Sequence, residues 1–386
     1  MSRNRAAVSI ALTSRRDEHR SAKRGTRTEI AKGSWRRVSA TVAGGAIICA
    51  AALFGGIHAQ PIVTVVMSGL DNPHGLAFGP EGALYVAEAG RGGDGPCFYN
   101  SAGEFRCYGP TGAITRLWKG EQVRVVAGLP SHAPPGGAFA GGPNDIGFQG
   151  VGGMFVTMSL GNDPQLVRPH LGPAGNVLGT LLQVNAAGGW RVVADVAAYE
   201  AAVDPNGGLI DSNPYGVLAE PESRLVVDAG ANALLRIAAD GTITTVAVFP
   251  SRPNRSTDSV PTAVAAGPDG AYYVGEATGA PFAAGAARIY RVVEGLEPEV
   301  YLQGFKMIVD LTFGDDGALY VLQFATGPVF FAGPGELIRV APDGTRTTVI
   351  GGLQFPTSIA LDDDGALYVT NRGITPGLGE VLRISQ

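Results

Sequence analysis

Short apolar strands separated by tight turns recur along most of this chain, and the last repeat shows the pattern most clearly. Residues 345–350 alternate between polar and apolar side chains, which is typical of a half-exposed β-strand. Two further short strands are predicted over residues 357–361 and 366–370, with an Asp-Gly turn between them. Asp-Gly tolerates the positive φ that a tight hairpin turn requires. Residues 380–384 predict one more strand.

One phrase in the second strand occurs six times and sets the period of the chain. Gly-Ala-Leu-Tyr-Val begins at Gly82, Gly317 and Gly365, with Gly-Ala-Tyr-Tyr-Val at Gly270 and looser copies at Gly152 and Glu222. The successive starts are 70, 70, 48, 47 and 48 residues apart. A period of about 40–50 residues built from short strands is typical of propeller blades. We therefore predict an all-β, six-bladed β-propeller with four-stranded blades, two of which carry insertions at residues 90–112 and 160–180.

The last blade is one strand short, and the beginning of the body supplies the missing strand. Residues 61–70 match residues 347–353 in their pattern of apolar and polar positions. Each of these segments also precedes the inner strand of a blade. We therefore expect residues 61–67 to complete the last blade and close the ring, which removes exposed sheet edges.

The first 59 residues differ from the body in charge and hydropathy. Residues 1–37 carry a net charge of +8, residues 38–57 form an apolar stretch, and residues 60–386 carry −13. A basic flank, an apolar run and a small residue, Ala59, before Gln60 favour a cleaved signal peptide. An uncleaved membrane anchor is the main alternative, because about 20 apolar residues can span a bilayer. A buried helix is a third interpretation.

This charge distribution divides the chain into a basic tail with a signal peptide or anchor, residues 1–59, and a propeller, residues 60–386. We expect the propeller to be exported, whether secreted, periplasmic or on the cell surface. It would meet a membrane only through residues 38–57, if these are retained. A body this acidic is a poor nucleic-acid binder, because Lys and Arg supply most non-specific affinity for phosphate. We expect a monomer whose partner is an unidentified small molecule or protein.

Two cysteines, Cys97 and Cys107, stay in the body after the leader is removed, and Cys49 leaves with it. An even number of cysteines in an exported domain favours a disulfide. Two free thiols are the alternative for a chain that stays in a reducing compartment.

Two columns of residues in the aligned repeats are candidates for a site. The innermost strand of each blade begins at one end of the central channel, and the second strand ends there, so both columns should converge on one face. The entry column contains His74, Asn144, Asp145, Tyr215, Thr262, Val309, Asp310, Thr357 and Ser358. The exit column contains Glu88, Met158, Asp228, Glu276, Gln323 and Asn371. We expect the polar members of these columns to line a ligand site at the channel mouth.

Asp145 and Asp310 lie in blades two and five, which face each other across a six-membered ring. Opposed carboxylates repel each other unless a cation or a proton lies between them. Oxygen ligands of this kind suit Ca²⁺, so these two residues are the candidate metal ligands. The alternative is a structural role, because an Asp beside a turn often accepts hydrogen bonds from nearby backbone amides.

The motifs of the body resemble the ScyD/ScyE family of exported bacterial propellers. They are the segments 87–90, 111–114, 211–216, 227–230 and 267–276, together with Cys97 and Cys107. The resemblance covers residues 61–386 and implies a six-bladed propeller outside the cytoplasm, but it assigns no reaction. More distantly, the repeats resemble NHL and gluconolactonase-type propellers, in which a channel-bound divalent cation serves lactone hydrolysis. Fold analogy is a weak warrant for the same activity in this chain.

The sequence therefore supports two functions of different class. The first is a non-enzymatic binding or scaffold protein that engages a ligand or partner with the channel face. It is favoured because no nucleophile–base pair is recognisable in the sequence and the loops of the first two blades are long. The second is a metal-assisted, lactonase-like hydrolase or lyase that uses a Ca²⁺-type cation.

Overall fold

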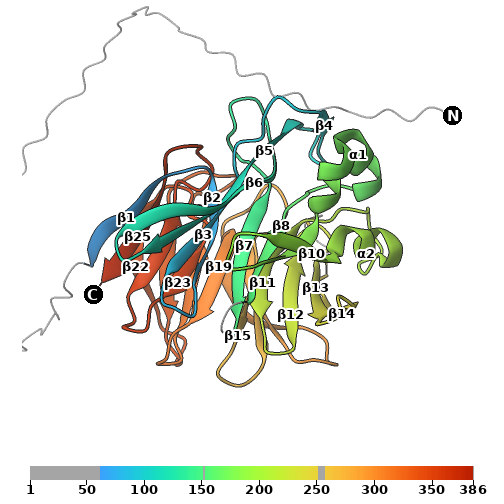
Figure 1. Ribbon diagram of the computed structural model, residues 1–386. Helices are drawn as coiled ribbons and strands as arrows, with labels where there is room; N and C mark the ends of the chain where they lie inside the picture. The colour runs from blue at the N-terminus through green and yellow to red at the C-terminus, as the bar shows by residue number, and fades with distance from the viewer. Residues whose placement is uncertain (1–60, 151–152, 251–256, 386) are drawn as a thin grey trace, which may run out of the picture. The chain divides into compact units, whose positions relative to one another are not determined.

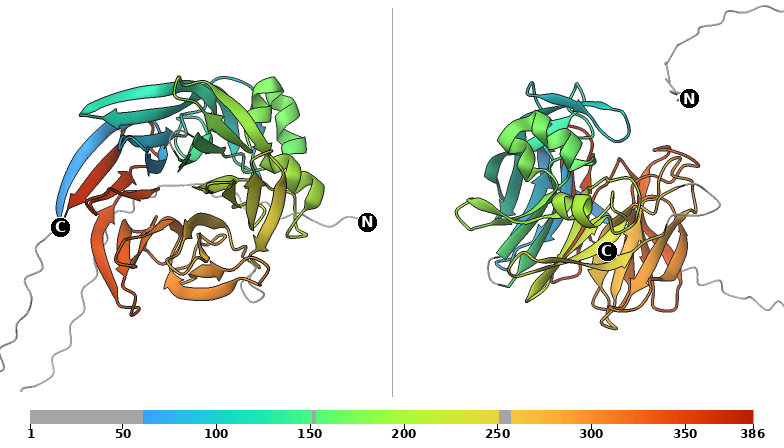
Figure 2. Two further views of the ribbon diagram at one scale, coloured as in Figure 1. Left: turned by 60° about the horizontal axis from the view of Figure 1, so that its bottom comes forward. Right: turned by 90° about the vertical axis from the view of Figure 1, so that its right-hand side faces the viewer.

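The computed structural model describes residues 61–150, 153–250 and 257–385, and these fold into a ring of six antiparallel sheets (Figure 1, Figure 2). This confirms the predicted six-bladed β-propeller. The predicted leader and Cys49 lie outside the described residues.

Blades one to three follow one another along the chain, and the strands of each run in order from the channel outward. Blade one consists of β2 (Pro73–Phe78), β3 (Leu84–Glu88), β5 (Phe105–Trp118) and β6 (Glu121–Ala133), with the additional strand β4 (Cys97–Tyr99) paired to β5. Blade two consists of β7 (Pro143–Gln149), β8 (Gly153–Met158), β9 (Thr180–Val184) and β10 (Trp190–Asp195). Blade three consists of β11 (Pro214–Ala219), β12 (Ser223–Asp228), β13 (Ala233–Ala238) and β14 (Ile243–Val248).

Blades four to six complete the ring without insertions. Blade four consists of β15 (Pro261–Ala266), β16 (Tyr272–Glu276), β17 (Ala287–Val292) and β18 (Glu299–Phe305). Blade five consists of β19 (Ile308–Phe313), β20 (Leu319–Gln323), β21 (Gly335–Val340) and β22 (Arg346–Leu353). Blade six consists of β23 (Ile359–Leu361), β24 (Leu367–Asn371), β25 (Gly379–Ser385) and β1 (Ile62–Leu70).

The ring closes as the sequence predicts, because β1 is the outer strand of blade six. It pairs with β25 in antiparallel register from Ile62 opposite Ser385 to Leu70 opposite Gly379. Met67 and Leu70 on β1 are buried, whereas Val63 is exposed. The first described strand of the chain thus holds the last one in place.

The repeated phrase builds the second strand of each blade, which is covered on both faces by its neighbours. The valine of the phrase is fully buried in all six blades, at Val86, Val156, Val226, Val274, Val321 and Val369. Burying one such side chain stabilises the fold by about 1.5–3 kcal/mol. These strands are therefore the centre of the apolar core between blades, which explains why the phrase varies so little along the chain.

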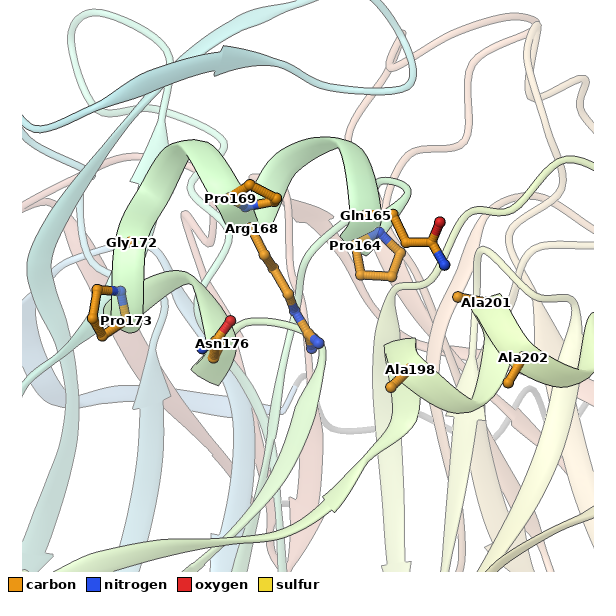
Figure 3. A pocket seen from close by; sticks show the side chains of 10 residues that line it. All are labelled: Pro164, Gln165, Arg168, Pro169, Gly172, Pro173, Asn176, Ala198, Ala201 and Ala202. Atoms are coloured by element: carbon orange, nitrogen blue, oxygen red, sulfur yellow. The ribbon is translucent and has the colours of Figure 1, made fainter.

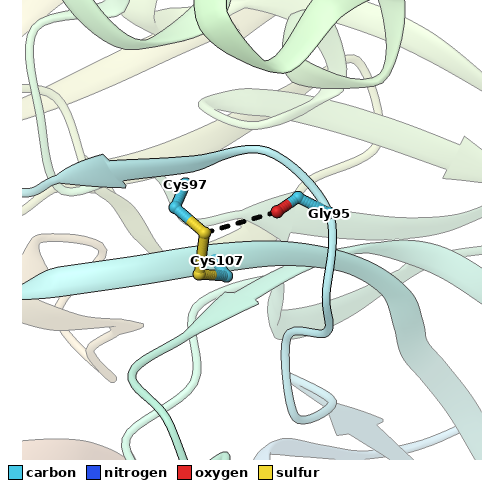
Figure 4. The surroundings of a disulfide bond; sticks show 3 residues. All are labelled: Gly95, Cys97 and Cys107. Carbon is cyan, nitrogen blue, oxygen red and sulfur yellow. Dashed lines mark hydrogen bonds between the residues drawn. A yellow bond between two sulfur atoms is a disulfide. The ribbon is translucent and has the colours of Figure 1, made fainter.

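The insertions of blades one and two lie together at one end of the ring (Figure 1). In blade one, Cys97 on β4 and Cys107 on β5 form a disulfide with an S–S distance of 2.01 Å (Figure 4). The predicted bridge is confirmed, and it indicates an oxidising environment. Blade two carries α1 (Pro164–Leu171) and the 3₁₀ helix η1 (Gly172–Val177), and α2 (Val196–Val203) leads into blade three. Within the described residues, no helix combines the length and the apolar character that a membrane crossing requires.

A chain that begins at residue 71 should lose the closure, because blade six then has three strands and an open edge. The lost burial of Met67 and Leu70 alone predicts destabilisation by about 3–6 kcal/mol. Thermal unfolding followed by circular dichroism tests this, with a chain that begins at residue 60 as the control. Cooperative unfolding of both chains at the same temperature would contradict the role of β1.

Candidate functional site

The first residues of the six inner strands converge on one narrow space, which we call the channel cavity. It is lined by His74, Gly75, Asn144, Asp145, Tyr215, Thr262, Val309, Asp310, Thr357 and Ser358, and its volume is about 10 Å³. The structure thus brings together the entry column proposed from the repeat alignment. A space of this size holds about one water molecule. Gly75 is required here, because a Cβ at this position would lie 2.4 Å from Asp145 Oδ1.

A chain of hydrogen bonds fixes the imidazole of His74 at the edge of this cavity. Asn144 Nδ2 donates to the Tyr215 carbonyl oxygen at 3.0 Å, so Asn144 Oδ1 faces His74 Nδ1 at 2.7 Å. Because Oδ1 accepts, Nδ1 carries the proton and Nε2 carries a lone pair. Nε2 is buried and has no hydrogen-bond partner among the described residues. Burial lowers the pKa of His74 to about 4, against the opposing effect of the hydrogen bond that Nδ1 donates to Asn144, so the imidazole is neutral at pH 7.

Asp145 braces blade two against blade three. Its Oδ1 accepts from the Ile146 amide at 2.8 Å, and its Oδ2 accepts from the Val217 amide on β11, also at 2.8 Å. Its own amide hydrogen-bonds to Thr157 Oγ1 at 2.9 Å. The side chain therefore joins neighbouring blades, which is more than the local turn contact that the structural alternative assumed.

Asp310 repeats this arrangement across the ring, between blades five and six. Its Oδ1 accepts from the Leu311 amide at 2.8 Å. Its Oδ2 accepts from Ser358 Oγ at 2.6 Å and from the Ile359 amide at 2.8 Å. Both acids of the predicted pair thus have inter-blade hydrogen bonds and face the same cavity.

The two carboxyls affect each other electrostatically. Burial, with the charge of Asp310 as a second cause, raises the pKa of Asp145 to about 8 despite its two backbone hydrogen bonds. Burial raises the pKa of Asp310 to about 6, against its bonds from Ser358, Ile359 and Leu311. Burial and the two carboxylates also raise the pKa of Tyr215. At neutral pH the pair therefore retains a proton, which relieves the repulsion that the sequence predicts.

The residues present do not form the multidentate donor set that Ca²⁺ takes. Ca²⁺ binds six to eight oxygen ligands. The channel cavity has two carboxyls, and each of their oxygens already accepts a hydrogen bond. In the part of the chain that the structure describes, no group of three or more His, Cys, Asp and Glu side chains is arranged to hold a metal ion. A cation on Asp145 and Asp310 stays a prediction.

The exit column has a different, repeated role, because its side chains hold the loop that precedes each inner strand. Gln323 Oε1 accepts from the Lys306 amide at 2.6 Å, and Asn371 Oδ1 accepts from the Gln354 amide at 2.7 Å. In blade three, Asp228 accepts from the Asn213 amide at 2.7 Å and from Ser212 Oγ at 2.6 Å. In blade four, Glu276 accepts from Ser259 Oγ at 2.6 Å.

Glu88 holds the corresponding loop in blade one, and it also forms an ion pair with the guanidinium of Arg124. Its Oε2 accepts from the Asp71 amide at 2.7 Å and pairs with Arg124 Nη2 at 2.6 Å, and Thr115 also donates to its carboxylate. None of the polar exit residues lines the channel cavity, and neither does Met158. Of the five acids in the two columns, only Asp145 and Asp310 therefore line the channel cavity.

A second, larger space adjoins the channel cavity, and we call it the mouth pocket. Its volume is about 220 Å³. It shares His74, Tyr215, Thr262, Val309 and Thr357 with the channel cavity. Its walls are apolar and come mainly from loops, with Phe139, Val260, Met307, Phe324, Phe331 and Ile374. The sequence analysis did not identify these loop residues. Two phenylalanines in one short loop, Phe324 and Phe331, could have indicated an apolar surface there.

The alternation of side chains along a strand explains why the exit residues do not line the mouth pocket. Side chains alternate between opposite sides along a strand. Ala229, Ala277 and Phe324 follow the exit residues Asp228, Glu276 and Gln323 directly, and these three line the mouth pocket. The exit residues point the other way, into the loops that they brace. The alignment of the repeats identified the correct end of the second strand in each blade. In blades three to five, the residue that lines the pocket is the one directly after the exit residue.

A groove of about 570 Å³ lies apart from the channel, between α1, η1 and α2 (Figure 3). Its walls are mostly proline and alanine, from Pro164 to Ala202. Its charged member, Arg168, donates to both carboxylate oxygens of Asp195 at 2.8 Å and to the Leu178 carbonyl oxygen. The groove is larger than the mouth pocket, but its guanidinium is already engaged in holding the two helices together.

Comparison with known proteins shows the fold and leaves the family open. No protein-family model matches the sequence, and no curated protein does. A gluconolactonase from Xanthomonas campestris is 10% identical, with a TM-score of 0.52 over 84% of this chain and 89% of its own. An oxidoreductase from Thermus thermophilus, provisionally assigned as a glucose dehydrogenase, is 16% identical, with a TM-score of 0.51 over 84% of this chain and 100% of its own.

Virginiamycin B lyase from Staphylococcus aureus is 14% identical, with a TM-score of 0.49 over 85% of this chain and 100% of its own. The neighbours with TM-scores above 0.5 are six-bladed propellers of the gluconolactonase and NHL type, as the more distant resemblance implies. Identities this low show the fold alone. The closer resemblance to the ScyD/ScyE family stays a prediction.

The raised pKa of Asp145 predicts a stability that falls as pH rises. Carboxyls of the unfolded chain titrate near pH 4. Between about pH 4 and pH 8 the folded state therefore binds more protons than the unfolded state, and its stability decreases with pH. Asp145→Asn should be less stable than the native chain at pH 5, by about 1 kcal/mol for the lost acceptor. At pH 8.5 the deficit should vanish or reverse, because the native chain loses at least about 1.4 kcal/mol of stability between the two pH values and the variant does not.

Calorimetric unfolding of both proteins at the two pH values measures this difference, with Asp363→Asn, in an exposed turn, as the matched control. A deficit that stays constant from pH 5 to pH 8.5 would contradict the proton held between the carboxyls. A chelator that lowers the melting temperature of the native chain, with no pH trend, would instead support the predicted cation.

Proposed function

We propose that this protein binds a small, neutral organic molecule in the mouth pocket and that the protein is exported. The observation that carries the proposal is the composition of this pocket. Apolar walls with a few convergent polar groups are the usual design of a ligand site. Its polar side chains, among them His74, Tyr215 and Asn213, are uncharged. The disulfide that implies an oxidising compartment supports export.

In this proposal, His74 accepts a hydrogen bond from a donor group of the ligand. A buried acceptor without a partner costs about 1–3 kcal/mol, which a donor on a ligand would recover. Nε2 of His74 is such an acceptor, since the described residues offer it no hydrogen. The Asn144 contact at 2.7 Å fixes the ring. Nε2 has almost no exposed surface, so a donor reaches it only after a small displacement of the side chains around it. A ligand with a hydroxyl or N–H group at its inner end satisfies the site.

Catalysis of a hydrolysis or an elimination is the second candidate, and the orientation of His74 by Asn144 is the observation that favours it. A general base works best when its pKa lies near the working pH. The pKa of His74 is lowered to about 4, so the imidazole is a hydrogen-bond acceptor and a weak base. This is why binding, and not catalysis, is the leading proposal. The metal-assisted form of the second candidate requires ligands beyond Asp145 and Asp310.

Titration calorimetry with phenol, benzyl alcohol and cyclohexanol tests the proposed binding in a chain that begins at residue 60. At least one of these neutral hydroxyl compounds should bind saturably at one site per chain. His74→Phe keeps a ring of similar size but removes both nitrogens, and it should weaken this binding by about 5- to 150-fold. His170→Ala, on the exposed side of α1, should leave it unchanged.

Two results would overturn the proposal. The first is the absence of saturable binding for all three compounds to the native chain. The second is binding that His74→Phe leaves unaltered while the variant unfolds at the native temperature, because the ligand would then lie elsewhere.

A further inference from the structure

Phe331 stands at the centre of a cluster of phenyl rings on the wall of the mouth pocket. Its ring centroid lies 5.3 Å from that of Phe282, 5.6 Å from Phe139 and 5.7 Å from Phe324. Phe324 in turn lies 5.2 Å from Phe355. These residues come from the loops of four different blades, so the cluster joins loops that are distant in the sequence.

Two of the clustered rings are only partly covered by their neighbours. Phe331 keeps 39% of its surface exposed and Phe139 keeps 40%, whereas Phe324 keeps 6%. Phe139, Phe324 and Phe331 all line the mouth pocket. Aromatic rings prefer offset-stacked or edge-to-face partners at centroid distances of about 4.5–7 Å. The open parts of Phe139 and Phe331 therefore offer positions for one more ring inside the pocket.

The backbone of the pocket wall is held in an unfavourable conformation. Phe139, Val260 and Met307 all have positive φ, at 51°, 53° and 44°. A left-handed backbone is uncommon for residues other than glycine and is an outlier for a β-branched residue such as Val260. Asn72 and Phe355, which precede Pro73 and Pro356 and do not line the pocket, have the same conformation at 49° and 48°. The conformation therefore belongs to the repeat, and in blades four and five it places Val260 and Met307 at the pocket wall.

The size and charge of the pocket limit what it can accept. None of the described residues that line it is Asp, Glu, Lys or Arg, and His74 is neutral. A carboxylate or phosphate group would enter without a counter-charge, which is strongly unfavourable in an apolar site, and the carboxyl pair of the adjoining channel cavity would repel it. A dry cavity of about 150 Å³ is known to bind benzene. The 220 Å³ of the mouth pocket therefore suits one substituted ring or two small fused rings.

We infer that the ligand of the mouth pocket is a neutral aromatic molecule of one or two rings that carries a hydroxyl or N–H donor. Its ring packs against Phe331 and Phe139, and its donor faces His74 Nε2. This inference rests on the proposed binding function and adds the chemical class of the ligand. An aliphatic alcohol meets the donor requirement but not the ring contacts, and a sugar has more hydroxyls than these apolar walls can satisfy.

Calorimetric titration with phenol, cyclohexanol, toluene and benzoate separates the two parts of the inference. Phenol should bind about 2- to 10-fold more tightly than cyclohexanol, which has a similar size and the same donor. Toluene should bind more weakly than phenol, and its affinity should not change in His74→Phe. Benzoate should show no binding at the concentration that saturates the site with phenol.

Phe331→Leu should bring the phenol and cyclohexanol affinities together, because it keeps an apolar wall without a ring. Phe330→Leu is the matched control, since Phe330 is exposed and does not line the pocket, and it should preserve the preference for phenol. Thermal unfolding of both variants shows whether the fold is intact. A loss of the preference in both variants, or in neither, would overturn the role of Phe331.

The outcomes distinguish this inference from the function on which it rests. Equal affinities for phenol and cyclohexanol, both weakened by His74→Phe, would overturn the aromatic class and leave the binding function intact. Phenol and toluene binding with equal affinity, unaffected by His74→Phe, would overturn the role of His74 and keep the aromatic class. Binding of none of the four compounds would overturn both.

Discussion

Closure of the ring by β1 on β25 is the constraint on which the rest of the structure depends. A closed ring of six twisted sheets forces the first residues of all six inner strands toward a single axis. Asp145 and Asp310 therefore face one cavity, although 165 positions in the sequence separate them, and His74 lies beside them. Without closure, blade six would be free to move away from blade one, and the mouth pocket would lose the wall that contains Thr357 and Ile374.

The fold was largely predictable from the sequence, because one strand phrase repeats with nearly constant chemistry. Its valine is buried in every blade, so packing preserves the signal. The entry residues were predictable for the same reason, since each follows from its position in the repeat. The exit residues were misplaced by one position, because an alignment of strand ends does not say on which side a side chain points. Phe139 and Phe331 lie in loops without periodicity, and their proximity arises only in three dimensions.

The polar and apolar parts of the site have separate tasks. Asp145 and Asp310 fasten blades two to three and five to six through backbone amides, and a proton reduces their repulsion. The backbone hydrogen bonds that these carboxyls accept offset the cost of burying their charge, and they also join neighbouring blades. His74 has one nitrogen fixed by Asn144 and the other without a partner in the described part of the chain. Its lowered pKa makes it suitable for receiving a hydrogen bond and poorly suited for removing a proton.

Nitrogen-15 NMR of the histidine rings tests this account of His74 most directly. In the free protein, His74 should be protonated at Nδ1 and unprotonated at Nε2, and it should not titrate between pH 5 and pH 8. Addition of phenol should shift the Nε2 resonance in the direction of a hydrogen-bonded acceptor and leave Nδ1 nearly unchanged. A His74 ring that titrates near pH 6.5, or an Nε2 resonance that phenol does not move, would contradict the account.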